Sequence, residues 1–315
     1  MKSALIVVAL VALVACGNDK SKAQPKPLPG TIYFVEDAPG PQLVRLAAGT
    51  RTVIGRDLFP SAHGLEDGRL VALASRGDGA ADSEQLALIG RDGRVERIGP
   101  AAAQVRDPAV DPRGRWITVA INVEGTSDLY RVELDGKTTR LTTEPHGNFA
   151  PAVLGESIVY VSSRDGNSEI YREGQRLTTH ERDDWQPTPS PDGKTIAFMS
   201  DRDGTPRIYL MEPDGTSQRR LTASAAEESA PTWSRDGKLL AYVAGAHGFV
   251  RDMTTGVDRQ LTPVGARDLE PSFSPDGKWL AVARMRGNAS DLVAIDLVSG
   301  DSTPIATNAR LPRWR

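Results

Sequence analysis

The sequence predicts an all-β fold, a β-propeller of four-stranded blades, and three observations lead to this prediction. One phrase recurs as PTPSPDGKTIAFMS from Pro187, PTWSRDGKLLAYVA from Pro231 and PSFSPDGKWLAVAR from Pro271, with a looser copy from Pro108. Prolines recur roughly every 40 residues, the period of propeller blades; they are Pro108, Pro151, Pro187, Pro231, Pro271 and Pro312. Each copy also reads as four short strands separated by turn residues.

The copy from Pro187 shows the order of elements within one blade. Residues 188–190 form a short first strand, and the turn PDGK at 191–194 follows, because proline fixes one dihedral angle and glycine accepts a positive one. A second strand at 195–200, a turn at 201–204 and a third strand at 207–211 come next. A turn at 213–215 and a last strand at 218–221 complete the blade. Such a sheet cannot cover both of its own faces, so neighbouring blades stack around an axis.

The number of blades follows from the last strands, which end at Leu141, Leu177, Leu221 and Leu261 and, less clearly, at Ile54, Ile98 and Ile305. The count favours seven blades. Six is the alternative, because the second blade (61–99) has EDGR at 66–69 in place of PDGK. The first blade (31–54) lacks a first strand, and LPRWR at 311–315 resembles a first strand with nothing after it. We therefore expect the C-terminal strand to pair with the first blade and close the ring, which removes exposed sheet edges.

The N-terminal residues predict export and lipid attachment. A short charged start is followed by twelve apolar residues, 4–15, which are too few to span a bilayer and are typical of a signal peptide. LVAC at 13–16 resembles the bacterial lipobox, in which cleavage precedes Cys16 and acyl chains such as palmitate are attached to it. The expected organisation is a signal peptide at 1–15, a lipidated Cys16 with a proline-rich flexible tether at 16–30, and the propeller at 31–315.

Charge and cysteine content exclude several classes of protein. The chain has 38 basic and 41 acidic side chains without a polybasic run, so we expect no binding of nucleic acid. Its single cysteine cannot form an internal disulfide. We expect a monomer without a cofactor.

The repeats resemble the TolB-type propeller repeat, a WD-type repeat in which Ser-Pro-Asp-Gly-Lys precedes a strand and an Asp-Arg-Asp-Gly-like turn follows. SPDGK at 274–278 and SDRDG at 200–204 carry this resemblance most clearly, and it covers 108–306 well and 31–99 poorly. The motif is specific for the fold and not for function, because it recurs in envelope scaffolds, lyases and peptidases. In lipoproteins like those of enterobacteria, Gly17 after the lipidated cysteine implies the outer membrane, facing the periplasm.

The sequence offers little support for catalysis. No Gly-x-Ser-x-Gly nucleophile elbow occurs, and GKT at 193–195 lacks the earlier glycine of a phosphate-binding loop. Some TolB-like lyases hold a metal with several histidines, and His63, His146 and His180 lie in loops between blades here. Their offsets from the next proline differ, however, so we expect isolated surface histidines and no metal site.

A mostly acidic set of residues precedes the blade prolines, and the repeat brings it to one rim. The predicted partner-binding residues are Asp107, His146, His180, Asp183, Asp184, Trp185, Glu227, Glu228, Asp268 and Glu270. A tryptophan in a loop beside acids is the kind of side chain that anchors an interface. The alternative interpretation is that the acids are solvated turn residues and that Trp185 packs on its own blade.

These observations predict a non-catalytic, lipid-anchored protein of the bacterial cell envelope that binds an envelope protein through its inter-blade loops. One alternative is a metal-dependent propeller enzyme, either a polysaccharide lyase or a hydrolase. Another is a carbohydrate-binding module that contacts saccharide through Trp185 without turnover.

Overall fold

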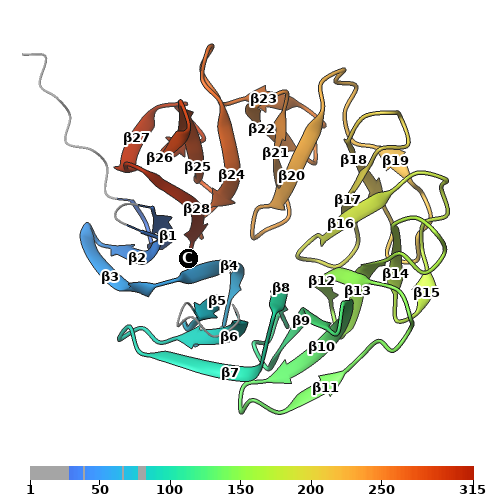
Figure 1. Cartoon of the computed structure of the whole chain (residues 1–315). Coiled ribbons are helices and arrows are strands. Elements are labelled where there is room, and N and C mark those ends of the chain that lie inside the picture. The colour runs from blue at the N-terminus through green and yellow to red at the C-terminus, as the bar shows by residue number, and fades with distance from the viewer. Residues whose placement is uncertain (1–27, 38–39, 66, 77–82) are drawn as a thin grey trace, which may run out of the picture.

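The computed structural model describes residues 28–37, 40–65, 67–76 and 83–315, and within these residues the chain forms only strands, turns and bends. The strands make seven separate four-stranded sheets arranged in a ring around one axis (Figure 1). The predicted all-β class and the count of seven blades are confirmed. Cys16, with the expected signal peptide and most of the tether, lies outside the described residues.

Strands are numbered along the chain, and within each blade they run in order from the innermost strand outward. Blade 1 contains β28 (Ala309–Trp314), β1 (Thr31–Glu36), β2 (Gln42–Ala47) and β3 (Thr50–Arg56). Blade 2 contains β4 (Leu58–Gly64), β5 (Leu70–Arg76), β6 (Ser83–Ile89) and β7 (Val95–Ala102). Blade 3 contains β8 (Gln104–Val110), β9 (Trp116–Val123), β10 (Thr126–Glu133) and β11 (Thr138–Arg140). Blade 4 contains β12 (Asn148–Leu154), β13 (Ser157–Ser162), β14 (Glu169–Arg172) and β15 (Gln175–Arg176).

The remaining three blades follow the same order. Blade 5 contains β16 (Asp184–Pro189), β17 (Ile196–Ser200), β18 (Arg207–Met211) and β19 (Arg219–Arg220). Blade 6 contains β20 (Glu228–Trp233), β21 (Leu239–Ala244), β22 (His247–Asp252) and β23 (Asp258–Gln260). Blade 7 contains β24 (Asp268–Phe273), β25 (Trp279–Arg286), β26 (Ala289–Asp296) and β27 (Ser302–Ala306).

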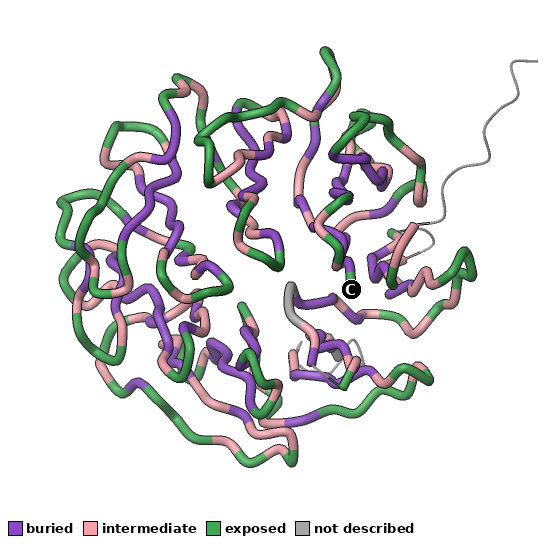
Figure 2. The backbone as a smooth tube through the Cα atoms, turned by 180° about the vertical axis from the view of Figure 1, so that it is seen from behind, coloured by how far each residue is buried: buried purple, intermediate pink, exposed green. Residues whose placement is uncertain are grey.

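Hydrophobic cores lie between neighbouring blades. Every residue of β17 and β18 is buried, because blades 4 and 6 cover the two faces of blade 5. The two strands therefore lack the alternation of apolar and polar residues that marks a half-exposed strand. Figure 2 shows buried segments within the blades and exposed segments in the loops. Since each interface is a small core of its own, the ring is stable only when every blade has two neighbours.

The ring closes through the two ends of the propeller, as the sequence predicted. β28 pairs antiparallel with β1, with Ile32 opposite Trp314, and the amide of Arg315 donates to the carbonyl oxygen of Thr31 at 2.7 Å. Trp314 is buried in a cluster with Ile32 and Trp279, so closure joins blades 1 and 7. Closure pairs the inner edge of β1 with β28, so blade 1 has four strands like the other blades.

The blade prolines lie inside the innermost strands. The sequence analysis expected each of these strands to begin only after its proline. In β12, β16, β20, β24 and β28 the strand begins three residues before the proline. The residue directly before the proline has a positive φ and marks a bulge in the pairing with the second strand. Bulges bend a strand and increase its twist, so the sequence before the proline is strand and not loop.

The PDGK turns join the first and second strands as predicted. In blade 5 the hydroxyl of Ser190 donates to Asp192 at 2.7 Å, and the amide of Lys194 donates to the same carboxylate at 3.1 Å. Gly193 has a φ of 70°, which suits glycine. Blades 6 and 7 repeat this turn with Ser234 and Ser274. In the described part of the chain, no helix is long and apolar enough to cross a membrane.

Candidate functional site

Two sets of connections meet on one face of the ring, which we call the loop face. The loops between blades lie here, together with the turns that join the second and third strands. Backbone hydrogen bonds tie the two sets together: Asp184 donates to the carbonyl oxygen of Ser168 at 2.8 Å, and Asp201 donates to that of Asp183 at 3.2 Å. The PDGK turns lie on the opposite face, because strands within a blade alternate in direction. The loop face is therefore a rigidly supported surface.

Three of the predicted partner-binding acids, Asp184, Glu228 and Asp268, are fully buried. Each is the first residue of an innermost strand, because the strand begins before the proline. Arg202 donates to Asp184 at 2.8 Å, and Arg284 makes two contacts with Asp268 at 2.7 and 2.8 Å. These carboxylates have no surface available to a partner, and their hydrogen bonds stabilise the blades and the contacts between them.

The Leu-Thr pairs that end the blades belong to the same network. Buried threonine hydroxyls donate to buried carboxylates at four successive interfaces; the pairs are Thr142 with Asp128, Thr178 with Glu169, Thr222 with Glu228, and Thr262 with Asp268. The carboxylate comes from the third strand of the same blade in blades 3 and 4, and from the first strand of the next blade at the later interfaces. A buried carboxylate thus accepts the threonine hydrogen bond at each of these interfaces, although it comes from different positions in the repeat.

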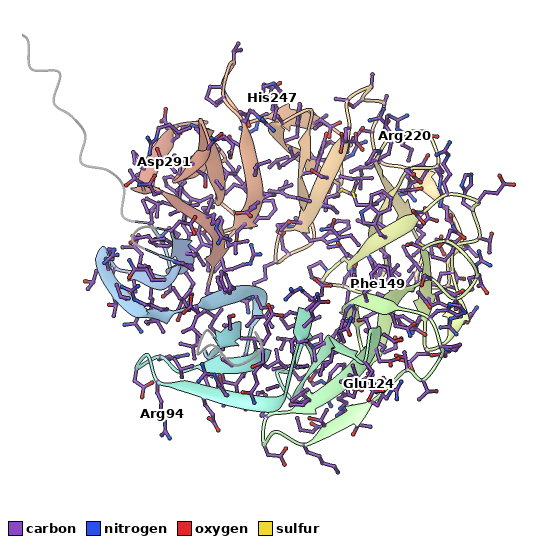
Figure 3. The ribbon with its side chains drawn as sticks, in the orientation of Figure 1. Arg94, Glu124, Phe149, Arg220, His247 and Asp291 are labelled. Atoms are coloured by element: carbon purple, nitrogen blue, oxygen red, sulfur yellow. The ribbon has the colours of Figure 1, made fainter. Side chains whose placement is uncertain are left out.

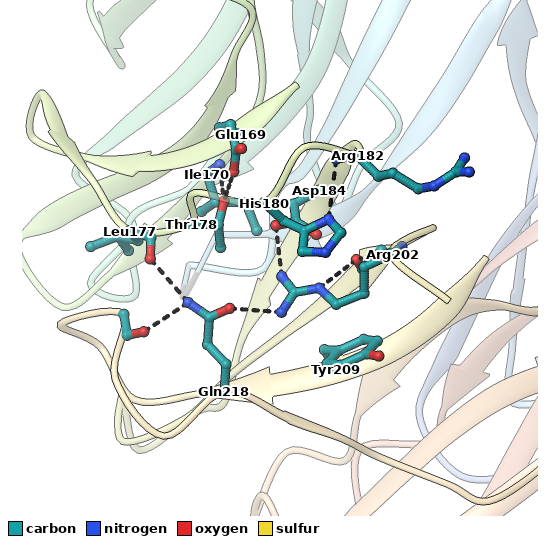
Figure 4. A network of polar contacts seen from close by, with 12 residues as sticks. Glu169, Ile170, Leu177, Thr178, His180, Arg182, Asp184, Arg202, Tyr209 and Gln218 are labelled. Carbon is teal, nitrogen blue, oxygen red and sulfur yellow. Dashed lines mark hydrogen bonds and ion pairs between the residues drawn. The ribbon is translucent and has the colours of Figure 1, made fainter. Parts of the chain in front are cut away.

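Figure 4 shows the network at the interface of blades 4 and 5. Arg202 links Asp184 to Gln218, and its guanidinium lies 4.6 Å from the ring centre of Tyr209. Burial raises the pKa of the Asp184 carboxyl, and the nearby Glu169 adds to the rise, while hydrogen bonds from Ser200 and Arg202 oppose it. The interface thus holds two buried acids, and each accepts a hydrogen bond from a donor in its own blade.

The other predicted residues lie at different depths. Asp107, Asp183 and Glu227 are exposed, and Glu270 is half-buried. Asp107 and Glu270 occupy the positive-φ position of the innermost strands, and Glu270 accepts a 2.6 Å hydrogen bond from the amide of Leu311 in the next blade. Both lie on innermost strands, which face the axis of the propeller, whereas Asp183 and Glu227 lie in the inter-blade loops. The structure therefore separates the predicted rim into an axial set and a loop set.

His146 and His180 are exposed in adjacent inter-blade loops, as the sequence analysis placed them. The Nδ1 atom of His180 accepts a 3.1 Å hydrogen bond from the amide of Arg182, and its carbonyl oxygen accepts one from Asn167 at 3.0 Å. The side chain of His63 is outside the described residues. Among the side chains that are described, no three His, Cys, Asp or Glu residues are placed to hold a metal ion.

Trp185 and Asp183 line a cavity of about 350 Å³ on the loop face, between blades 4 and 5. We call it the interblade hollow; its lining residues are Phe149, Ser168, Asp183, Trp185, Asp201, Gly204 and Pro206. Phe149 packs against the core between blades 3 and 4, and Trp185 packs against the core between blades 5 and 6. Figure 3 shows Phe149 beside β12 and β16. Each ring thus packs on a blade core on one side and is half-buried where it lines the hollow.

The charged groups that line the interblade hollow are two carboxylates with unused acceptor capacity. One oxygen of Asp183 accepts a 2.7 Å hydrogen bond from the amide of Ser168. The Oδ1 atom of Asp201 is buried and has no hydrogen-bond partner among the described residues. Asp201 forms an ion pair with Arg182, whose Nη1 lies 3.9 Å from Oδ2, without a hydrogen bond. The hollow therefore combines aromatic walls with negative charge.

Sequence reasoning identified Asp183 and Trp185 but missed Phe149, Ser168, Asp201 and Pro206. Asp201 had been assigned to a turn, and its neighbourhood with Asp183 depends on the folding of blade 5. A signal for Phe149 was present, since Phe149 and Trp185 each lie two residues before a blade proline in consecutive repeats. Equivalent positions in adjacent blades are neighbours in a propeller, so this repeat of an aromatic residue predicts a shared surface.

Taken together, the ring of seven four-stranded blades defines a seven-bladed β-propeller, and the supported hollow on its loop face is the candidate site. The TolB beta propeller domain family matches residues 172–314 of the chain. Over this part the chain is similar to TolB-type propellers, and the resemblance inferred from its repeats is confirmed.

Solved structures share the fold at low sequence identity. TolB from Acinetobacter baumannii is 22% identical with a TM-score of 0.60, and the match covers 90% of this chain and 66% of that one. A puromycin-hydrolyzing peptidase from Mycobacterium tuberculosis is 16% identical with a TM-score of 0.70, and the match covers 90% and 53%. An oligogalacturonate lyase in complex with manganese is 16% identical with a TM-score of 0.62, covering 89% and 86%. The chain thus spans less than two thirds of the TolB chain and about half of the peptidase.

Proposed function

We propose that this protein is a non-catalytic, lipid-anchored component of the bacterial cell envelope whose propeller binds a protein partner through its loop face. The observation that carries the proposal is the interblade hollow, where two aromatic rings and two carboxylates are held open on a rigid scaffold. Loops on such a scaffold are where binding normally resides, and aromatic residues dominate the energetics of interfaces. The likeness to TolB, a protein with the same fold, agrees with a binding scaffold.

Lipid attachment at Cys16 and an outer-membrane location facing the periplasm are part of the proposal and rest on the N-terminal sequence. Two or three acyl chains hold a protein to a bilayer stably, since each buried methylene contributes about 0.8 kcal/mol. The tether at 16–30 would let the loop face reach a partner beyond the membrane surface. Labelling with a palmitate analogue tests this part: incorporation that disappears in Cys16→Ser is the expected result, and equal incorporation in both forms contradicts it.

The binding proposal is tested by crosslinking and capture from envelope extract with the full chain. The comparison is among the wild type, the double variant Trp185→Phe with Asp183→Asn, and the control Glu181→Gln. Glu181 lies in the same loop and is exposed, but it does not line the hollow. We expect one protein to be captured by the wild type and the control and lost from the double variant. Equal capture by all three would place the binding surface elsewhere.

The enzyme alternative is tested by metal content. The fold is shared with a lyase that was solved with manganese, and with a puromycin-hydrolyzing peptidase. Stoichiometric manganese, zinc or calcium that disappears in His146→Ala or His180→Ala would support a metal-dependent enzyme. We expect the purified protein to contain less than about 0.1 equivalent of each metal.

A further inference from the structure

The interface of blades 4 and 5 differs from the other blade interfaces at one equivalent position, two residues before the blade proline. In blades 3 to 7 and then blade 1, this position holds Arg106, Phe149, Trp185, Ser229, Leu269 and Arg310, and strand pairing gives Phe59 the equivalent place in blade 2. Only Phe149 and Trp185 are aromatic residues in consecutive blades. The interblade hollow is therefore a local feature, and the repeat itself does not require it.

The charges around the hollow are paired within their own blades, with few exceptions. Arg202 is held by Asp184, and Arg164 contacts Glu144 at 3.2 Å and Tyr160 at 2.7 Å. Asp183 and Asp201 remain with carboxylate oxygens that accept no hydrogen bond from the described residues. Arg182 is largely exposed and remains 3.9 Å from Asp201. The lining of the hollow is thus acidic.

The blades already use a guanidinium over an aromatic ring next to this hollow. Arg164 lies 4.0 Å from the ring centre of Tyr171 in blade 4, and Arg202 lies 4.6 Å from that of Tyr209 in blade 5. In both, a carboxylate completes the contact, since Arg164 pairs with Glu144 and Arg202 with Asp184. The hollow presents the same two components, aromatic faces and carboxylates, without a cation of its own among its lining residues.

We infer that the interblade hollow receives a lysine or arginine side chain of the protein partner, between Phe149 and Trp185 and next to Asp183 and Asp201. The inference rests on the proposed function and names the chemistry that the partner must present. An aromatic face attracts a cation electrostatically, and carboxylates add charge-assisted hydrogen bonds. The volume of about 350 Å³ is at the small end of ligand cavities, about 300–1,000 Å³, which suits one side chain better than an extended saccharide.

The test uses the full chain and small probes that differ in charge. The probes are Nα-acetyl-arginine amide, Nα-acetyl-lysine amide and, as the uncharged control, Nα-acetyl-norleucine amide. Binding is followed through the indole N–H resonance of Trp185, which Trp185→Phe identifies among the five tryptophans of the chain. We expect the cationic probes to shift this resonance saturably and the norleucine probe to leave it in place.

Charge-removing variants decide which groups hold the cation. Asp183→Asn and Asp201→Asn should each weaken binding of the arginine probe by about fivefold, because a partly exposed ion pair is lost. Asparagine still accepts the hydrogen bond from Ser168, so the loop should keep its fold, which the other four indole resonances report. Glu181→Gln should change the affinity by less than about twofold.

Three results would overturn the inference: no shift with either cationic probe, an equal shift with norleucine, or affinities unchanged in both aspartate variants. The proposed function is judged separately. If a partner is captured through Trp185 and Asp183 but the cationic probes are not preferred, the proposed function stands and the inference fails. The partner would then contact the hollow through uncharged groups. Cation binding without any captured partner would contradict the proposed function and leave the chemistry of the hollow as described.

Discussion

At the scale of single residues, burial separates two kinds of acid that the sequence presents in the same way. Glu227 and Glu228 are neighbours before a blade proline, yet Glu227 is exposed and Glu228 is fully buried against blade 5. The buried member accepts hydrogen bonds from Thr222 and from the amide of Ile208 at 2.9 Å. A carboxylate in such a place stabilises the fold only while its donors remain, because an unpaired buried charge is costly.

This difference predicts unequal effects of substitution on stability. Asp268→Ala removes the partner of Arg284 and Thr262 and should lower the free energy of unfolding by about 3 kcal/mol. Glu227→Ala, at an exposed position before the preceding blade proline, should change it by less than about 0.5 kcal/mol. Urea unfolding followed by circular dichroism measures both. Similar midpoints for the two variants would show that the Asp268 network contributes nothing to stability.

At the scale of elements, the strands and turns follow from local chemistry, and the sequence predicted most of them. Residues 195–200 and 207–211 were predicted as strands and contain β17 and β18, because apolar runs of this length between Gly and Pro turns favour buried strands. The predicted innermost strands began after the blade proline, whereas the observed strands begin before it. The positive φ at Gln186 and its equivalents makes a bulge through which the strand continues past the proline. Asp184 was predicted in a loop and is buried in a strand, whereas Asp183 lies in the loop as predicted. The two residues are of the same type, so the sequence does not distinguish them.

The PDGK turns predict a dependence of stability on pH. A hydrogen bond from the Ser190 hydroxyl, followed by one from the amide of Lys194, lowers the pKa of the Asp192 carboxyl below its ordinary value, and Asp236 has the same arrangement. A lowered folded pKa gives stability that is present above the unfolded pKa and is lost as pH falls through the folded pKa. Stability should therefore fall between about pH 5 and about pH 2.

Asp192→Asn keeps an acceptor oxygen in the turn but cannot titrate, so the fall in stability with pH should become shallower. Urea midpoints measured at intervals across this pH range give the comparison, and Glu181→Gln, which removes a charge from an exposed loop residue, is the control. A pH dependence of Asp192→Asn as steep as that of the wild type would mean that the turn aspartate is not a source of it.

At the scale of the whole molecule, ring closure and the loop face depend on one another. Each blade has neighbours on both sides only because β28 completes blade 1, and the interblade hollow exists only because blades 4 and 5 are held side by side. The sequence predicted closure from two incomplete repeats. It did not predict the hollow as a unit, because the hollow combines residues from two blades whose positions depend on the completed ring.

Trp314→Ala tests the contribution of closure. Trp314 is 5% exposed and packs with Ile32, Phe34 and Trp279, so its removal should lower the free energy of unfolding by about 3–5 kcal/mol. Val264→Ala is the matched control, because Val264 is 99% exposed. Urea unfolding with intrinsic fluorescence measures both, and a loss below about 1 kcal/mol for Trp314→Ala would mean that the ring holds without this contact.

The most direct test of the central claim, that a partner binds the loop face, is photocrosslinking in intact cells from two positions in blade 5. A photoreactive residue replaces Glu181 on the loop face or Lys194 in the PDGK turn on the opposite face; both are exposed. We expect one discrete protein adduct from position 181 that is lost with Trp185→Phe and Asp183→Asn, and none from position 194. An adduct from position 194 alone, or the same adduct from both positions, would contradict the account.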